Sequence, residues 1–335
     1  MKKKFSQIAY RLKFFTLVLI APLLLSWGPF GHERINRSAT LALSAPLQSF
    51  FYNHVDFITQ ESSVPDLRKY TLNDNAEKPR HFIDLENFGV SDSLPVSLIE
   101  AKKRYNEKFL QQNGILPWYI EEIMDKLTRA FKERRKTEIL FLAADLGHYL
   151  GDAYMPLHTT VNHDGQLTNQ KGIHGFWESQ LPEVFGDKYN LFIDNAVYIQ
   201  DVSKETWRII NSTHMLVDTL LQADRQLKQQ FPADKVYSID DSGNPRKTRF
   251  NVPIHSPEYS LQYNHKLNGM VERQMRLAAA ATANFWYTAW VNAGKPNLDD
   301  LDPAYQTKRN KTNLHRELKL FKHGKLFDIK SEKEF

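Results

Sequence analysis

The segment 137–154 constrains the fold of this chain most strongly, because its residues TEILFLAADLGHYLGDAY are apolar on nearly every face of a helix. A helix of this kind is stable only when other helices surround it. The segment also contains His148 and Asp152, and a buried aspartate needs a strong partner, of which a cation is a common one. The sequence therefore predicts a central buried helix with a polar site built onto it.

Helical periodicity, rather than the alternation typical of strands, runs through most of the remaining chain. We expect an all-α fold whose further helices lie within residues 33–43, 46–57, 95–113, 117–131, 195–231 and 256–293. The segments 65–87 and 159–175 are rich in Asn, Asp, Gly and His, and we expect them to be loops that carry function. The insertion 232–255 is polar and resembles a hairpin. A single multi-helix domain is predicted over 27–302.

Residues 1–26 are typical of a secretory signal peptide. They contain five Lys or Arg residues and no acidic residue, followed by an apolar run over 14–25 and a small residue, Ser26. The apolar run is too short to cross a bilayer comfortably. We expect cleavage before Trp27 and a secreted or periplasmic protein, with an uncleaved membrane anchor as the alternative.

Charge and cysteine content exclude several classes of function. The chain has 44 Lys and Arg against 39 Asp and Glu, and the five basic residues of 1–26 account for the whole excess. A body of balanced charge is no electrostatic trap for nucleic acid, although a small basic groove is compatible with it. The lysine-rich tail 303–335 is expected to be peripheral, either touching an anionic membrane or ending in solvent. Because the chain has no cysteine, a metal site would have to use His, Asp and Glu.

Histidine and carboxylate residues are paired at metal-ligand spacing along the central segment. His148 and Asp152 are four residues apart and share one helix face. Gly147 and Gly151 flank that face without side chains, so another helix or an ion can approach closely. A proline then ends the helix and turns the chain, which lets His158 return to the same place.

Two further pairings extend the set. His174 and Glu178 have the same four-residue spacing, and Asp66 precedes His81 in the polar segment. Each pair alone is more often a surface hydrogen bond or a helix cap. Together they offer enough imidazole and carboxylate donors for more than one ion, and this donor chemistry suits zinc.

Cleavage of the leader would add a further donor group. The mature chain would begin with Trp27, whose free amine and carbonyl can chelate a metal, and His32 could add a third bond. Alternatively, the segment WGPFG is only a turn anchored by an aromatic residue.

These motifs occur in one order along the chain, from Trp27 to Glu178: WGxxGH, an Asp before HFID, Hx3Dx5H and Hx3E. In this order they resemble the zinc-dependent phospholipase C and S1/P1 nuclease superfamily. The resemblance implies an all-α zinc-dependent phosphoesterase with three zinc ions. The first would be held by Asp66, His81, His148 and Asp152, the second by His158, His174 and Glu178, and the third by the Trp27 amine and carbonyl with His32 and Asp152.

The chemistry implied is hydrolysis of a phosphoric ester. A hydroxide activated by zinc would attack phosphorus in line with the leaving oxygen, and Asp66 would orient the water or accept its proton. Glu178, where the nuclease branch has Asp, and a 162–174 loop without GGND favour a phospholipase C-like enzyme. The short spacing from Trp27 to His32 favours the nucleases.

We therefore predict a phospholipase C-like enzyme acting on phospholipid. An S1/P1-type single-strand nuclease or 3′-nucleotidase acting on nucleic acid or nucleotides is the alternative. A non-catalytic zinc-binding protein of the cell envelope is the second alternative. No obligate protein partner is indicated.

Four side chains near the motifs are candidate substrate contacts. Phe82 would stack on a base or line a wall against an acyl chain, and Asp84 would accept a hydrogen bond from a base. Tyr149 and Trp177 are further candidates for the pocket. Ordinary packing is the alternative for each of them.

Overall fold

The chain folds as helices around one long buried helix. The computed structural model describes residues 28–72, 74–89, 94–248, 251–299, 301 and 307–326. Within these ranges the regular elements are helices, and strand pairing is limited to isolated β-bridges. The all-α prediction is therefore confirmed. The predicted signal peptide and Trp27 lie outside the described residues.

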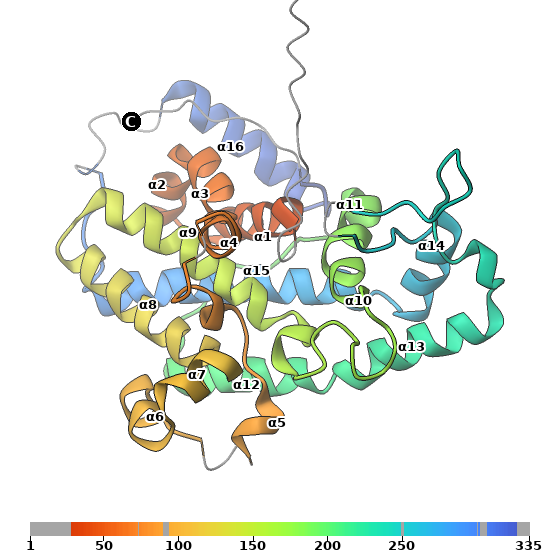
Figure 1. The fold of residues 1–335 in the computed structure, drawn as a ribbon. Helices are drawn as coiled ribbons and strands as arrows, with labels where there is room; N and C mark the ends of the chain where they lie inside the picture. Colours follow the sequence, from red (N-terminus) through yellow and green to blue (C-terminus); the bar gives the residue numbers. More distant parts are fainter. Residues whose placement is uncertain are drawn as a thin grey trace, which may run out of the picture.

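Helix α9 (Lys136–Ala153) is the centre of the fold, as its all-round apolar sequence predicts (Figure 1). It packs against α8 (Leu116–Lys132), α1 (Gly28–Ala42), α3 (Val55–Glu61) and α15 (Met270–Asn292). Leucine, isoleucine and alanine side chains along α9 are fully buried by these neighbours. Burial on several sides fixes the direction of this helix and hence of the polar side chains near its end.

The two glycines of α9 allow α1 to approach closely, as predicted. A Cβ atom on Gly147 would lie 1.9 Å from Oδ1 of Asn36, and one on Gly151 would lie 2.9 Å from Nδ1 of His32. Both distances are shorter than real Cβ contacts allow. The side chains of α1 therefore occupy the space that α9 leaves free, and one of these side chains is His32.

The long predicted helical runs are divided by short turns. The segment 95–113 forms two helices, because the Asn106 side chain accepts a hydrogen bond from Phe109 N at 2.8 Å and starts the second one. Gly269, with a left-handed φ of 72°, divides 256–293. Apart from α16, described below, the helices not yet named are α2 (Leu47–Asn53), α4 (Val64–Tyr70), α5 (Leu85–Phe88), α6 (Leu98–Arg104), α7 (Glu107–Asn113), α10 (Ile173–Gly175), α11 (Leu181–Phe185), α12 (Val202–His214), α13 (Val217–Gln230) and α14 (Pro257–Lys266).

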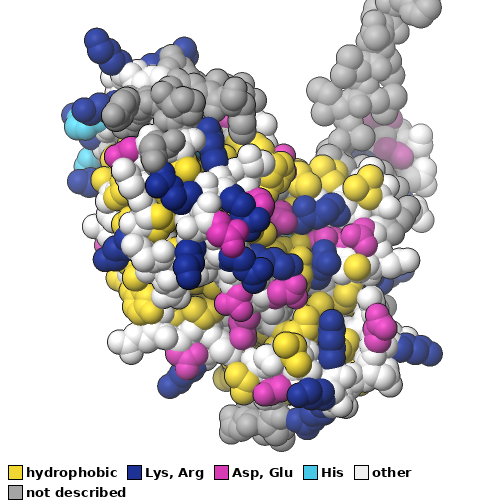
Figure 2. All heavy atoms as spheres, turned by 90° about the vertical axis from the view of Figure 1, so that its left-hand side faces the viewer, with side chains coloured by type: hydrophobic (Ala, Val, Ile, Leu, Met, Phe, Trp, Pro, Cys, Tyr) yellow, Lys and Arg dark blue, Asp and Glu magenta, His cyan; other side chains and the backbone are white. Residues whose placement is uncertain are grey.

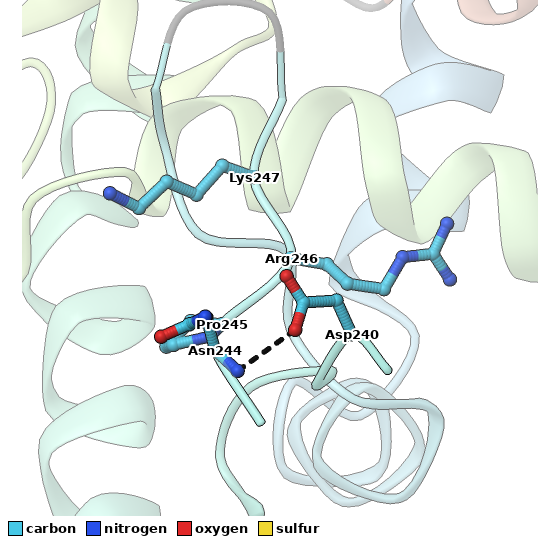
Figure 3. Close-up of a pocket in the computed structure, with 5 residues that line it drawn as sticks. All are labelled: Asp240, Asn244, Pro245, Arg246 and Lys247. Carbon is cyan, nitrogen blue, oxygen red and sulfur yellow. Dashed lines mark hydrogen bonds between the residues drawn. The ribbon is translucent and has the colours of Figure 1, made fainter. Parts of the chain in front are cut away.

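The polar insertion between α13 and α14 doubles back on itself through antiparallel bridges from Tyr237 to His255 and from Lys247 to Pro253. A hollow of about 560 Å³ lies on it, lined by Asp240 and residues 244–247 (Figure 3). All of these lining residues are exposed, and Asn244 N donates to Asp240 Oδ1 at 2.9 Å. The hollow is therefore an open feature of the hairpin surface, and it contains none of the predicted site residues.

A helix near the C-terminus packs against the body of the protein. Residues Lys308–Phe321 form helix α16, which contacts α2. Glu317 on α16 is fully buried and accepts hydrogen bonds from Arg37 Nε at 2.6 Å and from Tyr52 Oη at 2.8 Å. The sequence did not predict this helix, because the lysines of 308–321 obscure the helical spacing of its apolar residues. The boundary at residue 302 stays a prediction.

The surface carries both signs of charge. Figure 2 shows Lys and Arg side chains interspersed with Asp and Glu on one face of the molecule. This mixture agrees with the balanced charge of the sequence after residue 26. In the part of the chain that the structure describes, no helix combines the length and hydropathy needed to cross a bilayer.

Candidate metal centre

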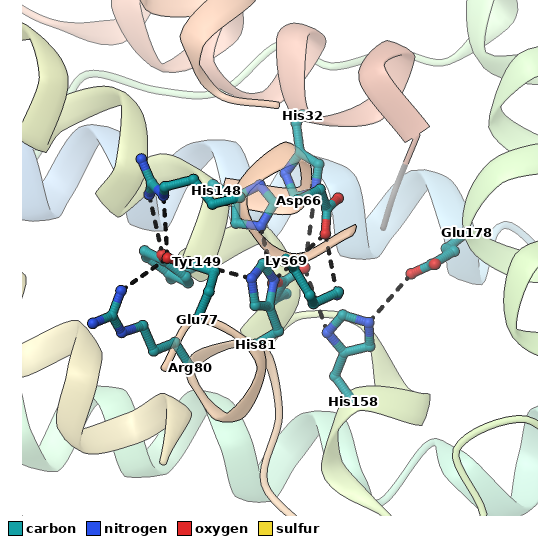
Figure 4. A network of polar contacts seen from close by, with 12 residues as sticks. His32, Asp66, Lys69, Glu77, Arg80, His81, His148, Tyr149, His158 and Glu178 are labelled. Atoms are coloured by element: carbon teal, nitrogen blue, oxygen red, sulfur yellow. Dashed lines mark hydrogen bonds and ion pairs between the residues drawn. The ribbon is translucent and has the colours of Figure 1, made fainter. Parts of the chain in front are cut away.

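Histidines and carboxylates from six segments converge at the C-terminal end of α9 (Figure 4). The chain brings them together because α9 ends at Ala153 and the following turn runs back beside it. The contributing elements are α1 with His32, α4 with Asp66, the 3₁₀ turn Lys78–His81 with His81, α9 with His148 and Asp152, the 3₁₀ turn Pro156–Thr159 with His158, and the segment Ile173–Gln180 with His174 and Glu178.

Asp152 is the common member of this constellation. Its Oδ2 lies 2.9 Å from Nδ1 of His81 and 3.3 Å from Nε2 of His148. Its Oδ1 lies 3.4 Å from Nδ1 of His158 and 3.8 Å from Nε2 of His32. Burial alone would raise the pKa of Asp152, but His148 and His158 outweigh it and hold this pKa well below its ordinary value. The carboxylate is therefore an anion that faces four imidazoles.

Asp66 and Lys69 stand beside this centre on one face of α4. Asp66 is fully buried, and its Oδ1 lies 3.6 Å from Nδ1 of His81 and 3.1 Å from Nζ of Lys69. Burial would lower the pKa of Lys69, but Asp66 and its other anionic neighbours raise it above its ordinary value. The site thus holds a cationic ammonium next to a buried carboxylate.

The second group contains His158, His174 and Glu178. His174 Nε2 lies 2.8 Å from Glu178 Oε1, as expected for residues four apart on one turn. His158 Nε2 lies 3.5 Å from Glu178 Oε2 and 3.3 Å from His174 Nε2. Burial would lower the pKa of His174, but Glu178 raises it to about 9. Glu178 lies in a single π-helical turn, Phe176–Gln180, a feature that often marks functional sites.

Backbone carbonyls orient two of the histidines. His148 Nδ1 lies 2.7 Å from the carbonyl oxygen of Ser62, and His174 Nδ1 lies 2.8 Å from that of His163. A carbonyl oxygen only accepts, so each Nδ1 carries a proton and each Nε2 faces the centre, where a metal ion would replace its proton. Metal-bound histidines are commonly oriented in this way.

The unsatisfied atoms of the centre fit a bound cation. His32 is fully buried, and neither of its ring nitrogens has a hydrogen-bond partner within the described residues. Burial and the neighbouring His148 lower the pKa of His32 well below its usual value, so the ring is neutral and able to coordinate. Tetrahedral zinc, with bonds of 2.0–2.1 Å to nitrogen, separates its donors by about 3.3 Å. The donor pairs around Asp152 and Glu178 are 2.8–3.8 Å apart, which matches zinc.

The donors fall into three groups of mutually close atoms within the described chain: His32 with Asp66 and His148; His81 with His148 and Asp152; and His158 with His174 and Glu178. The last group has the membership predicted for the second ion. In the first group His32 is joined by Asp66 and His148, whereas the sequence analysis joined it to Asp152 and Trp27. The division of the donors among individual ions stays a prediction.

The candidate substrate contacts divide into two kinds. Phe82 and Asp84 are half-buried on the segment that follows His81, and Ile83 N donates to His158 O at 2.8 Å, which holds this segment against the second group. Burial, with a contribution from Glu86, raises the pKa of Asp84 to about 6.

Tyr149 and Trp177 differ from the expectation, because both are completely buried and present no surface to a substrate. The Tyr149 hydroxyl donates instead to Glu77. The all-round apolar character of 137–154, which placed the helix at the centre, agrees with the burial of Tyr149 inside the protein.

Sequence reasoning missed two residues that the structure brings to the site. Lys69 follows Asp66 by three residues, a spacing that pairs them on a helix, but 65–87 was expected to be a loop. Glu77 lies four residues before His81 and faces its ring, with Oε1 3.4 Å from Nε2. The spacing of both pairs was visible, whereas the helical turns that make it meaningful were not predicted.

Comparison with known proteins finds a similarity to a nuclease. The chain is 24% identical over 189 residues to nuclease S1 of Aspergillus oryzae (strain ATCC 42149 / RIB 40). The match covers 52% of this chain and 61% of the relative, so it spans less than two thirds of that protein's length. No family model matches the chain.

Proposed function

The similarity to nuclease S1 supports membership of the S1/P1 nuclease superfamily, and from this premise we propose that the chain is an exported, zinc-dependent phosphodiester hydrolase. One observation carries the proposal. Eight donors that the sequence singled out, spread over 147 positions from His32 to Glu178, lie in one connected and largely buried constellation around Asp152. A buried cluster of imidazole and carboxylate groups is suited to binding metal ions.

Zinc would be held by the three donor groups described above. When bound, zinc supplies a Lewis acid that activates water at neutral pH and neutralises charge on a phosphoryl group. Asp66, held by Lys69 at 3.1 Å, is the carboxylate available to orient that water or to accept its proton. Lys69 Nζ is a point cation that would bind a non-bridging phosphate oxygen.

A single-stranded nucleic acid or nucleotide is the substrate class that we favour. The relative is named a nuclease, and the aromatic ring of Phe82 lies directly after His81 on a half-exposed segment, where a base can stack. The balanced charge of the chain after residue 26 then means that Lys69 and the bound metal ions, rather than a basic surface, would attract the phosphate.

Phospholipid is the second candidate, and a specific observation keeps it. Glu178 stands where the nuclease branch has Asp, and the 162–174 loop has no GGND segment. The Glu178 side chain has one methylene group more than an aspartate. Its carboxylate therefore extends further into the second donor group. This difference would reshape the floor of the substrate site between His158 and His174.

The experiment compares both substrates on one sample. Mature protein beginning at Trp27 is assayed on single-stranded DNA and RNA and on phosphatidylcholine vesicles, with and without chelator, beside Asp66→Asn. We expect chelator-sensitive cleavage of nucleic acid and a rate loss in Asp66→Asn that far exceeds any loss of folding stability. Cleavage of the vesicles alone would transfer the protein to the phospholipase branch. Absence of both activities in a zinc-loaded sample would contradict the proposed function.

A further inference from the structure

A buried carboxylate lies directly behind the candidate metal centre. Glu77 precedes the 3₁₀ turn that carries His81 and has no solvent exposure. A buried carboxylate is retained only when charged or hydrogen-bonding partners surround it. Figure 4 shows Glu77 on the side of His81 that faces away from Asp66.

Three donors fix the Glu77 carboxylate as an anion. Arg80 Nη1 donates to Oε2 at 2.8 Å, Arg68 Nε donates to the same oxygen at 3.1 Å, and the Tyr149 hydroxyl donates to Oε1. Two guanidinium groups on one carboxylate make protonation unfavourable. The donors also hold the carboxylate in place, since they approach it from α4, from the 3₁₀ turn and from α9.

Beside these three donors, the Glu77 carboxylate faces the ring of His81. Glu77 Oε1 lies 3.4 Å from His81 Nε2, a separation that a small ring movement would shorten to a hydrogen bond. Nε2 has no hydrogen-bond partner within the described residues. The opposite nitrogen, Nδ1, lies 2.9 Å from Asp152 Oδ2 and 3.6 Å from Asp66 Oδ1. The ring of His81 thus stands between one carboxylate behind it and two in the centre.

We propose that Glu77 is a positioning residue that keeps the proton of His81 on Nε2 and turns the Nδ1 lone pair toward Asp66 and Asp152. The inference rests on the proposed function, because it treats His81 as a metal ligand. An anion behind Nε2 favours the tautomer protonated there, and it increases the electron density that Nδ1 can donate to a metal. Backbone carbonyls hold the outer ring nitrogen, Nδ1, of His148 and His174, whereas for His81 the outer nitrogen is Nε2 and Glu77 is the acceptor beside it.

The cradle of Glu77 also connects the His81 turn to α9. Arg68 Nη2 donates to Asp145 Oδ2 at 2.7 Å, and Asp145 lies on the same helix as His148. Tyr149 is the neighbour of His148 in sequence, and its hydroxyl contacts Glu77. The orientation of His81 is therefore coupled to the helix that carries two of the other donors.

The test measures zinc affinity in folded protein. Wild type, Glu77→Gln and Glu77→Asp are titrated with a chromophoric chelator, and the bound zinc is counted by mass spectrometry. Glu317→Gln is the matched control, because Glu317 is equally buried and accepts from an arginine and a tyrosine but belongs to none of the three donor groups. The control shows how much zinc affinity changes when a buried carboxylate of this kind is lost elsewhere.

We expect Glu77→Gln to weaken the binding of one zinc ion by about 10- to 100-fold while the second donor group keeps its ion. Glu77→Asp keeps the charge that the arginines need, so it folds even where Glu77→Gln does not, and its shorter side chain should weaken zinc in the same direction. Glu317→Gln should lose thermal stability with zinc affinity unchanged.

Three results decide the matter. Wild-type zinc affinity in either folded Glu77 variant, or an equal loss in Glu317→Gln, overturns the role of Glu77. Weakened zinc in a chain whose wild type cleaves no phosphodiester supports the role of Glu77 and contradicts the proposed function. A wild-type chain that binds no zinc overturns both.

Discussion

The close approach of α1 to α9 gives the sharpest prediction, made on the substitution Gly147→Ala. In an exposed helix this change stabilises by about 1 kcal/mol. Here the added Cβ would lie 1.9 Å from Oδ1 of Asn36, whose Nδ2 donates to Ile58 O at 3.1 Å and to Ala144 O at 3.3 Å. The Asn36 side chain is fully buried and must move.

The cost follows from these contacts. Loss of the two hydrogen bonds removes about 1 kcal/mol each, and the overpacked interface costs a further 1–3 kcal/mol or so. After the gain in helix propensity, we expect Gly147→Ala to lower the free energy of unfolding by about 2–4 kcal/mol. For a folded body of about 300 residues this corresponds to a fall in the melting temperature of roughly 3–6 °C.

The assay is urea and thermal unfolding in excess chelator, so that metal binding does not add to the stability of the chain. Gly175→Ala is the matched control, because Gly175 is exposed, has φ −64°, and would place its Cβ with nothing within 4 Å. We expect that variant to gain about 0.5–1 kcal/mol. A Gly147→Ala protein as stable as wild type would refute the packing argument.

The remaining predictions concern other parts of the molecule. Glu317→Ala should cost about 3–5 kcal/mol in unfolding experiments, because it removes the carboxylate that accepts hydrogen bonds from buried Arg37 and Tyr52, and a loss below 1 kcal/mol would show that α16 contributes little. Burial lowers the pKa of His255 to about 3, so folding stability should be full above pH 6.5 and fall toward pH 3, and His255→Phe should flatten that decline. Lys69→Gln should cut turnover by about 100-fold at unchanged zinc content, as a phosphate-binding cation would. A residue added before Trp27 should lower zinc occupancy, and unchanged occupancy would exclude the N-terminal chelate.

Local sequence patterns predicted the parts of the fold that depend on local physics. The apolar segment 137–154 predicted the central helix, and its two glycines predicted the close approach that α1 makes. The four-residue spacing of His174 and Glu178 predicted a contact that the structure shows at 2.8 Å. Each of these predictions depends only on residues that are close together in the sequence.

Features that depend on distant partners were not predicted. Glu317 pairs with Arg37, which lies 280 positions earlier in the sequence. No pattern within 308–321 predicts this partner. The roles of Lys69 and Glu77 were not predicted. Their segment is polar, and its short helical turns carry no apolar periodicity that would indicate a helix. Tyr149 was placed in the substrate site because its neighbours in sequence are donors, whereas its ring is fully buried beside His81 and His148, with centroids 5.5 and 5.2 Å apart.

Zinc content measured side by side in wild type and Asp152→Ala tests the central claim most directly. Both proteins, beginning at Trp27, are purified with equal zinc supply, and the metal per chain is counted by mass spectrometry. Because Asp152 faces four histidines, we expect about three zinc ions in wild type and the loss of about two in the variant. A wild-type protein without zinc, or a folded variant that keeps all of it, would contradict the account.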